Sequence, residues 1–312
     1  MQLLRQFSNG CAMQLGSDNS EPKSVVKSFS HHEWQHERAS HRLALNPWVS
    51  DRLSRANLDI PHPVYDFLFT YYSFPPARLL RWSPGVDSPV ASDNVSTLDW
   101  STYYKKHALG WVIPRDSFPS HRKNYLNWAA RYLTETGERP PFFGCFGLHE
   151  WAMLYKAPSP RHKAVPLRVS PNDIETVVDS LQLRCTHYDA FRFFTPSARP
   201  LNRNNLTRIT TTQHDQPACI HASMDLYRFA YKIAPFCPSS ILQEAFLLAV
   251  KARTIDMQAS PYDLSEYGLK AIAIETPSGR EAYIEHQRDL FRLAKPIRDK
   301  LLSVYRYLTE SP

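Results

Sequence analysis

The chain has 312 residues, of which 43% are hydrophobic and 21% are charged. This composition excludes a wholly disordered chain and suits one large domain or two small ones. No window approaches the roughly 18 consecutive apolar residues of a membrane span, so we expect no membrane partner. The net charge of +7 fits nucleic acid, an anionic small molecule, or ordinary solubility.

The cysteine pattern argues against a disulfide scaffold or a zinc ribbon. The number of cysteines is odd and no CxxC pair occurs. Reduced thiols in a cytoplasm fit best, and a cysteine nucleophile is possible without any distinctive signature. The five cysteines are Cys11, Cys145, Cys185, Cys219 and Cys237.

The segment 1–27 has the character of a disordered leader or tail without a secretory signal. Residues 28–312 are expected to form a single domain that is mainly α with a few short strands; an α+β fold is the alternative. The pattern Ser30-His-His-Glu33 is a capping box that predicts a helix to about residue 46. Pro47 should interrupt this helix, with a shorter helix continuing to about residue 57.

The most aromatic stretch of the chain covers 61–82 and predicts a helix that ends before Pro75. Residues 83–116 should be irregular with short strands, and a helix should run over 120–136. A strand is expected over 162–170, followed by a helix from Ser170 as N-cap to about residue 183. The last third is helical, with an apolar stripe over 241–252 and a final helix that has a capping box at Ser278 and a kink at Pro296.

Three central blocks each place a cysteine, a histidine and a carboxylate among aromatic residues. They read FGCFGLHEWAM (143–153), LRCTHYDAFRFFTPSARPLNR (183–203) and CIHASMDLYRFAYK (219–232). In the third block, His221 and Asp225 are four residues apart and should share one helical face. His187 and Asp189 share a side only if their segment is extended, whereas adjacent residues such as His149 and Glu150 point about 100° apart on a helix.

Several chemistries can use these side chains. A metal-free acid–base site would use a carboxylate to activate water and a histidine to orient it. A zinc or iron site would use His149, His187 and His221 with one of the nearby carboxylates. The alternative is a purely structural network in which the buried polar groups satisfy one another. The candidate catalytic residues are Glu150, His187, Asp189, His221 and Asp225.

A loop rich in arginine follows the second block. Between residues 184 and 208 there are five arginines and one acidic residue, Asp189. Guanidinium groups bind phosphate or carboxylate oxygens in a bidentate manner, so this loop indicates an anionic ligand. The arginines expected to bind it are Arg192, Arg199, Arg203 and Arg208.

The motifs HPVYDFLFTYYSFPPARLLRW, FGCFGLHEWAM, RCTHYDAFRFFTPSARPLNR, HASMDLYRFAYK and ASPYDLSEYG resemble a bacterial family labelled 3-methyladenine DNA glycosylase. The resemblance covers about residues 60–310, although no helix-hairpin-helix signature is present. It implies DNA repair by base excision, in which an alkylated base enters an aromatic pocket and a carboxylate assists attack by water. Such an enzyme requires no cofactor. The pocket residues would be Tyr71, Tyr72, Trp151, Phe193 and Tyr227.

Two other function classes remain open from the sequence. One is an enzyme, with or without a metal ion, whose small substrate carries a phosphate or a carboxylate. The other is a non-catalytic nucleic-acid-binding protein.

Overall fold

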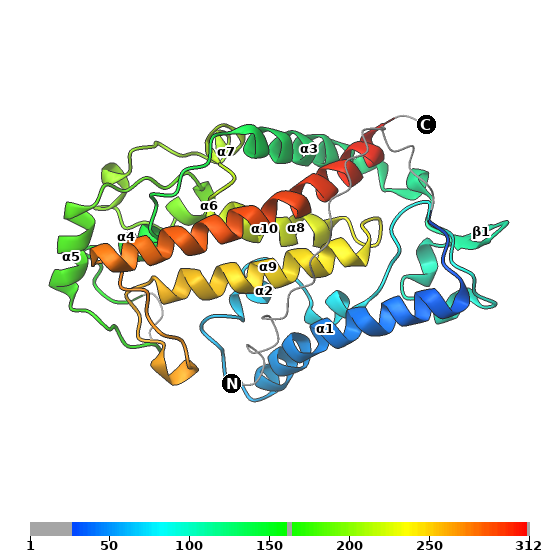
Figure 1. Cartoon of the computed structure of the whole chain (residues 1–312), viewed down its shortest axis with the longest axis horizontal. Coiled ribbons are helices and arrows are strands. Elements are labelled where there is room, and N and C mark those ends of the chain that lie inside the picture. Colours follow the sequence, from blue (N-terminus) through cyan, green and yellow to red (C-terminus); the bar gives the residue numbers. More distant parts are fainter. Residues whose placement is uncertain (1–26, 161–163, 311–312) are drawn as a thin grey trace.

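The computed structural model describes residues 27–160 and 164–310, and in these residues the fold is mainly α-helical as expected. The predicted leader lies outside the described residues except for Lys27. Five longer helices build the fold (Figure 1): α1 (His31–Asn57), α3 (Lys123–Glu138), α8 (Ile220–Lys232), α9 (Ser239–Gln258) and α10 (Pro277–Thr309). Shorter ones are α2 (Phe67–Thr70), α4 (Leu148–Ala152), α5 (Pro171–Ser180), α6 (Tyr188–Phe191) and α7 (Thr211–His214).

The centre of the fold is the helix pair α8 and α9. Helix α10 packs against α3, α8 and α9, and α1 lies against α9 on the opposite side (Figure 1). Almost every residue of α8 is buried, because this helix is covered by neighbours on most sides. The apolar stripe predicted over 241–252 forms the buried side of α9, so the packing of these helices follows the sequence pattern.

Helix α1 begins as predicted but does not break at Pro47. Ser30 and Glu33 form both hydrogen bonds of the capping box, so the predicted N-terminus is confirmed. The expected interruption is wrong, since one helix continues through Pro47 to Asn57. Proline removes the hydrogen bond to the carbonyl of Leu43, and this side of α1 is solvent-exposed, where water can replace the lost donor.

The aromatic segment forms less helix than expected. Only α2 and a 3₁₀ turn over Pro76–Leu80 are helical, and Ser73 takes a positive φ of 55° that ends helical geometry before Pro75. The following region is irregular as predicted. Its antiparallel hairpin consists of β1 (Lys105–His107) and β2 (Gly110–Val112), with Lys106 opposite Trp111.

Three boundaries differ from the sequence predictions. The strand expected over 162–170 is wrong for its described part, which forms only a bridge between Leu167 and Tyr262, because Pro166 lacks an N–H for a ladder. Helix α5 does use the capping box of Ser170, although it ends at Ser180. The N-cap of α10 is Thr276 rather than Ser278, and the helix is unbroken at Pro296.

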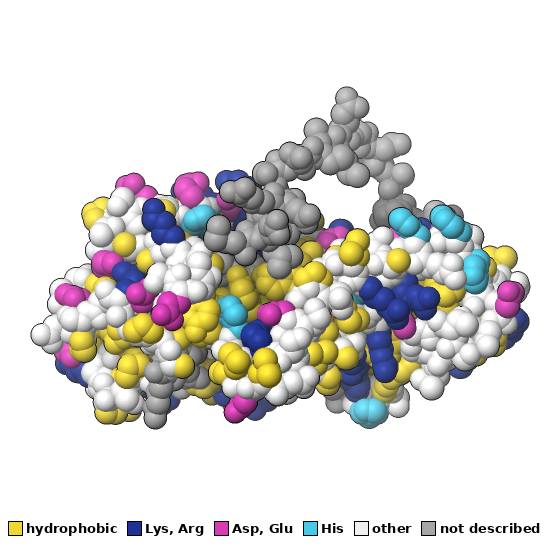
Figure 2. All heavy atoms as spheres, turned by 90° about the horizontal axis from the view of Figure 1, so that it is seen from below, with side chains coloured by type: hydrophobic (Ala, Val, Ile, Leu, Met, Phe, Trp, Pro, Cys, Tyr) yellow, Lys and Arg dark blue, Asp and Glu magenta, His cyan; other side chains and the backbone are white. Residues whose placement is uncertain are grey.

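The face that includes α1 carries charged side chains of both signs among hydrophobic ones (Figure 2). Lysine and arginine side chains do not merge there into one continuous basic surface. In the described part of the chain, every helix is too short or too polar to cross a membrane.

Candidate active site

The three central blocks meet around one narrow cavity. Residues of α4, α6 and α8 line it together with α9 and the aromatic segment around α2. Its internal space of about 70 Å³ exceeds the roughly 10–15 Å³ that one water needs. The lining residues are Phe67, Tyr71, Tyr72, Glu150, Met153, His187, Asp189, Ala190, Phe193, His221, Asp225 and Arg253.

A sharp turn positions the first block. Phe146 and Gly147 both have positive φ values, of 48° and 68°, and α4 starts immediately afterwards. A Cβ at Gly147 would lie 3.3 Å from the Cβ of Ala259, so glycine allows close packing as well as the turn. The turn places His149 and Glu150 inside the protein, where they are 6% and 4% exposed. Only Glu150 of the two lines the main cavity.

Only one of the two carboxylate oxygens of Glu150 accepts a hydrogen bond from the described residues. Its Oε1 accepts a hydrogen bond from Nη1 of Arg253 at 3.2 Å, whereas its buried Oε2 lacks a hydrogen-bond partner among the described residues. The same Nη1 donates to Oδ2 of Asp256 at 2.7 Å. The guanidinium of Arg253 also lies 4.3 Å from the ring centre of Phe67. One buried arginine therefore holds Glu150 on the cavity wall and Asp256 behind it.

His149 and Asp256 form a second buried contact beside this arginine. His149 Nε2 and Asp256 Oδ1 are 2.7 Å apart, but they are not aligned as a hydrogen bond. Burial disfavours charge on both groups, yet each stabilises the charge of the other. The pKa of His149 is therefore raised above its ordinary value and that of Asp256 is lowered.

The second and third blocks share another buried network. His187 Nδ1 lies 3.0 Å from Asp215 Oδ2, and the hydroxyl of Tyr132 donates to the same oxygen at 2.6 Å. Burial opposes the charge of His187, but Asp215 outweighs it and raises the pKa of His187 to about 9. His187 Nε2 lies 3.9 Å from Asp225 Oδ2, so the charge on His187 faces the cavity wall.

Asp225 is the most heavily bound carboxylate of the cavity. Tyr72 donates to its Oδ1 at 3.0 Å, and Arg228 donates to its Oδ2 at 2.5 Å. Burial raises the pKa of Asp225 although Arg228 lies against it. Arg228 also contacts Asp189 at 3.4 Å, which connects the two carboxylates. These bonds suit Asp225 to electrostatic and structural roles more than to proton transfer.

His221 connects the two clusters. Its ring is stacked on His187 with centroids 5.2 Å apart and meets His149 edge-on at 4.4 Å. Burial and the neighbouring His149 hold the pKa of His221 well below its ordinary value, so this imidazole is neutral near pH 7. The prediction that His221 and Asp225 share a helical face is confirmed, since both line the cavity from α8.

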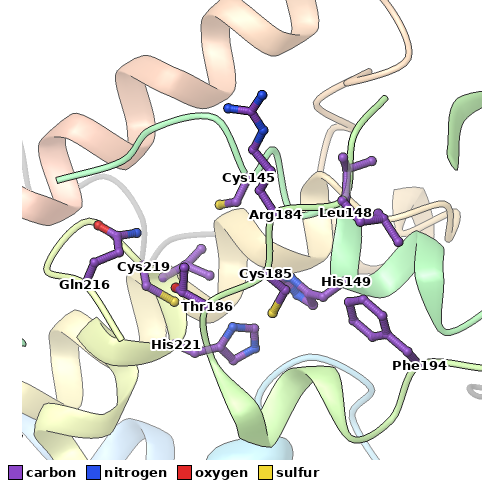
Figure 3. Close-up of a pocket in the computed structure, with 12 residues that line it drawn as sticks. Cys145, Leu148, His149, Arg184, Cys185, Thr186, Phe194, Gln216, Cys219 and His221 are labelled. Atoms are coloured by element: carbon purple, nitrogen blue, oxygen red, sulfur yellow. The ribbon is translucent and has the colours of Figure 1, made fainter. Parts of the chain in front are cut away.

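A second, smaller cavity lies behind His221 (Figure 3). Its volume of about 20 Å³ is enough for one water. Figure 3 shows His149, Cys185 and His221 converging there from different segments. Burial raises the pKa of the thiols of Cys145, Cys185 and Cys219, so these cysteines are poor nucleophiles in the folded protein.

Aromatic rings line one side of the main cavity, here called its mouth, and Arg192 lies against two of these rings. Phe67 and Tyr71 are stacked with centroids 4.6 Å apart. Arg192 Nη2 lies 3.5 Å from the hydroxyl of Tyr71, and Arg192 Nε lies 3.1 Å from Asp189. The guanidinium of Arg192 also lies 4.3 Å from the ring centre of Phe193.

Arg192 also borders an open groove of about 470 Å³. Arg199 and Arg208 line the same groove, together with Tyr188 and Asn205. Three of the four arginines predicted for anion binding are thus brought together beside the cavity mouth. Arg203 is exposed and lines neither this groove nor the main cavity.

Two residues predicted for the pocket wall lie elsewhere. Trp151 is fully buried and donates from Nε1 to the carbonyl of Ala259 at 2.9 Å. Tyr227 packs against Phe74 and Phe246. Tyr227 is two residues from Asp225 on α8 and so points about 200° away from the cavity.

Three residues of the site were missed from the sequence: Asp215, Arg253 and Asp256. Asp256 continues the apolar stripe of α9, seven residues after Ala249 and four after Ala252. A carboxylate at a buried stripe position was the signal that could have identified it. Asp215 lies in an irregular segment after α7, where no periodicity predicts burial.

The predicted metal set is only partly brought together. Among the described residues, His149, His221 and Asp256 have ligand atoms that all lie within 4.8 Å of one another. His187 does not belong to this group, because its Nδ1 is taken by Asp215. The carboxylate of the set is therefore Asp256 rather than Glu150, Asp189 or Asp225.

The arrangement has the parts of a hydrolytic site. A buried carboxylate oxygen without a partner can bind and deprotonate water, neutral His221 can orient it, and the charged His187 can stabilise negative charge. The aromatic mouth suits a planar group. No protein-family model matches the chain, and comparisons with curated proteins and with solved structures find no significant match. The resemblance to 3-methyladenine DNA glycosylases therefore stays a prediction.

Proposed function

We propose that this protein is an N-glycosidic hydrolase that releases an alkylated purine base from DNA. The observation that carries the proposal is the buried, unpartnered Oε2 of Glu150 on the wall of a cavity whose mouth is aromatic. A carboxylate at this place can position the attacking water and stabilise the cationic sugar that forms as the bond breaks.

The aromatic mouth supports the binding of a base. Tyr71, Tyr72 and Phe193 all line the cavity, and Tyr71 and Phe193 each have the guanidinium of Arg192 nearby. Stacking on such rings contributes roughly 1–3 kcal/mol per base in single-stranded complexes, which offsets part of the cost of unstacking it. An alkylated purine carries positive charge, and Asp189 and Asp225 on the same wall would favour it.

The arginine groove supports the binding of a polyanion. Arg192 lines the groove and contacts Asp189 of the cavity at 3.1 Å, so phosphates held by Arg199 and Arg208 would lie near a base in the cavity. Cations near the cavity are needed to hold the DNA backbone on either side of a flipped base. The net charge of +7 agrees with this partner.

A second candidate is an enzyme for a small phosphate- or carboxylate-bearing substrate. The small volume of the main cavity favours this candidate, since about 70 Å³ is well below the roughly 300–1,000 Å³ of typical ligand pockets. A base would require Tyr71, Phe193 and the exposed Arg192 to move apart. A small substrate would enter with less rearrangement.

Release of bases from methylated DNA tests the proposal. Chromatography of the supernatant should find free alkylated purine with wild-type protein, and alkaline gel analysis should find abasic sites in the same DNA. Bound DNA without release at any salt concentration would contradict the proposal and favour a binding protein. Neither binding nor release would favour the small-substrate enzyme.

A further inference from the structure

We propose that His149, His221 and Asp256 form a site for one divalent transition metal ion, either zinc or iron(II). The three residues come from α4, α8 and α9, and their ligand atoms all lie within 4.8 Å of one another. Two imidazole nitrogens and one carboxylate oxygen are a ligand set that both metals accept. This inference does not depend on the proposed glycosylase activity.

The contact between His149 and Asp256 gives an independent reason to expect a metal ion here. Nε2 and Oδ1 face each other at 2.7 Å as an ion pair, and neither atom has a hydrogen-bond partner among the described residues. The two side chains are 6% and 0% exposed, so water does not readily compensate them. An ion bound by both atoms would replace this contact after they move apart by less than about 1 Å, as the ligands of a tetrahedral zinc site lie roughly 3.3–3.6 Å apart.

The surroundings of Asp256 resemble the outer shell of a metal site. Arg253 Nη1 donates a hydrogen bond to Asp256 Oδ2 at 2.7 Å, while Asp256 Oδ1 faces His149. Such a hydrogen bond fixes the orientation of a ligating carboxylate. The same guanidinium holds Glu150, which keeps a further unpartnered oxygen on the cavity wall.

Space next to His221 allows an open coordination position. His221 borders the main cavity of about 70 Å³ as well as the smaller one of about 20 Å³. Three protein ligands with room for water or substrate are typical of catalytic metal sites, whereas structural zinc sites use four protein ligands. We therefore infer a site that a small oxygen donor can reach.

Metal titration of the full chain tests the site without any substrate. Protein stripped with a chelator would be titrated with Zn²⁺ against a chromophoric competitor, with Fe²⁺ under anaerobic conditions, and with Co²⁺ followed by its visible absorption. We expect one ion per chain, and the Zn²⁺ and Fe²⁺ arms decide which metal binds more tightly. Absence of stoichiometric binding by all three ions would overturn the proposal.

The variants His221→Gln and Asp256→Asn identify the ligands. Each should weaken binding by about 100-fold or more, since loss of outer-shell partners alone costs 10–100-fold. His41→Gln is the matched control, because His41 is also a buried histidine but hydrogen-bonds to the carbonyl of Leu79. If Asp256→Asn does not fold, the variant His221→Gln at a partly exposed position still shows whether the site binds metal. Wild-type affinity in folded His221→Gln would overturn the proposal.

Discussion

Arg253 Nη1 lies 3.2 Å from Glu150 Oε1 and 2.7 Å from Asp256 Oδ2, so one buried guanidinium bridges a carboxylate of the cavity wall and a fully buried one behind it. Burying these charges is costly, and the bridge reduces that cost; it leaves Glu150 Oε2 without a hydrogen-bond partner among the described residues and Asp256 Oδ1 in contact with His149. The site therefore keeps one buried acceptor, Glu150 Oε2, available where a fully satisfied structural network would not.

Replacing Arg253 with methionine should destabilise the fold by about 3–5 kcal/mol, because two buried carboxylates lose their cation. Urea unfolding of chelator-treated protein measures this change. Arg292→Ala is the matched control, since the exposed pair of Arg292 with Asp289 should contribute less than about 1 kcal/mol. Equal effects of the two substitutions would show that the bridge does not stabilise the fold.

The pair of His187 and Asp215 predicts a pH dependence of stability. The folded-state pKa of His187 is raised to about 9 from an ordinary value of 6.5. The stabilisation is therefore fully present below about pH 6.5 and is lost as the pH rises through 9. Each unit of the shift corresponds to about 1.4 kcal/mol, so the loss should amount to a few kcal/mol.

Urea midpoints between pH 6 and pH 10 measure this loss. The variant His187→Gln should be less stable at pH 6 and should show a flatter profile between pH 6.5 and 9. Parallel profiles for the wild type and the variant would mean that His187 is not the titrating group.

The residues on α8 illustrate what the sequence could predict. Helical spacing correctly placed His221 and Asp225 on one face, because the pattern is local and the helix is regular. The same geometry could have excluded Tyr227, which is two residues from Asp225. Spacing therefore identifies a shared face, but it does not say which face is directed to the cavity.

Residues distant in sequence account for most of what was missed. Asp215 and Asp256 reach the histidines only through tertiary packing, over sequence separations of 28 and 107 residues from His187 and His149 respectively. Pro47 was expected to interrupt a helix, but tertiary contacts of α1 with α9 outweigh the local cost. The overall helical class was predictable because it depends on periodicity alone.

The cysteines of the described residues should be unreactive in the folded state. Burial raises the pKa of Cys185 to about 12 and also raises those of Cys145, Cys219 and Cys237. In the variant Cys11→Ser, a colorimetric thiol reagent at pH 8 should label none of these four rapidly, and all four after denaturation. Fast labelling of a native thiol would identify a reactive cysteine and contradict the expectation from the raised pKa values.

The arginine groove predicts how DNA binding depends on salt. If Arg192, Arg199 and Arg208 each contact one phosphate, their joint replacement by alanine should reduce the slope of log K against log salt by about 3. Fluorescence anisotropy with labelled DNA measures the slope. Replacing the exposed α10 residues Arg288, Arg292 and Arg306 should leave it nearly unchanged. A larger effect of the α10 replacements would place the DNA on a different face.

The most direct measurement of the central claim is the single-turnover rate of base release by the variant Glu150→Gln. Glutamine keeps the size of the side chain but cannot accept a proton or stabilise a cationic sugar as well as a carboxylate does. We expect at least a roughly 100-fold lower rate with DNA affinity within about threefold of the wild type. Asp179→Asn, on the far side of Tyr155 and outside the cavity, is the matched control and should release base at the wild-type rate. Wild-type release by folded Glu150→Gln would contradict the account.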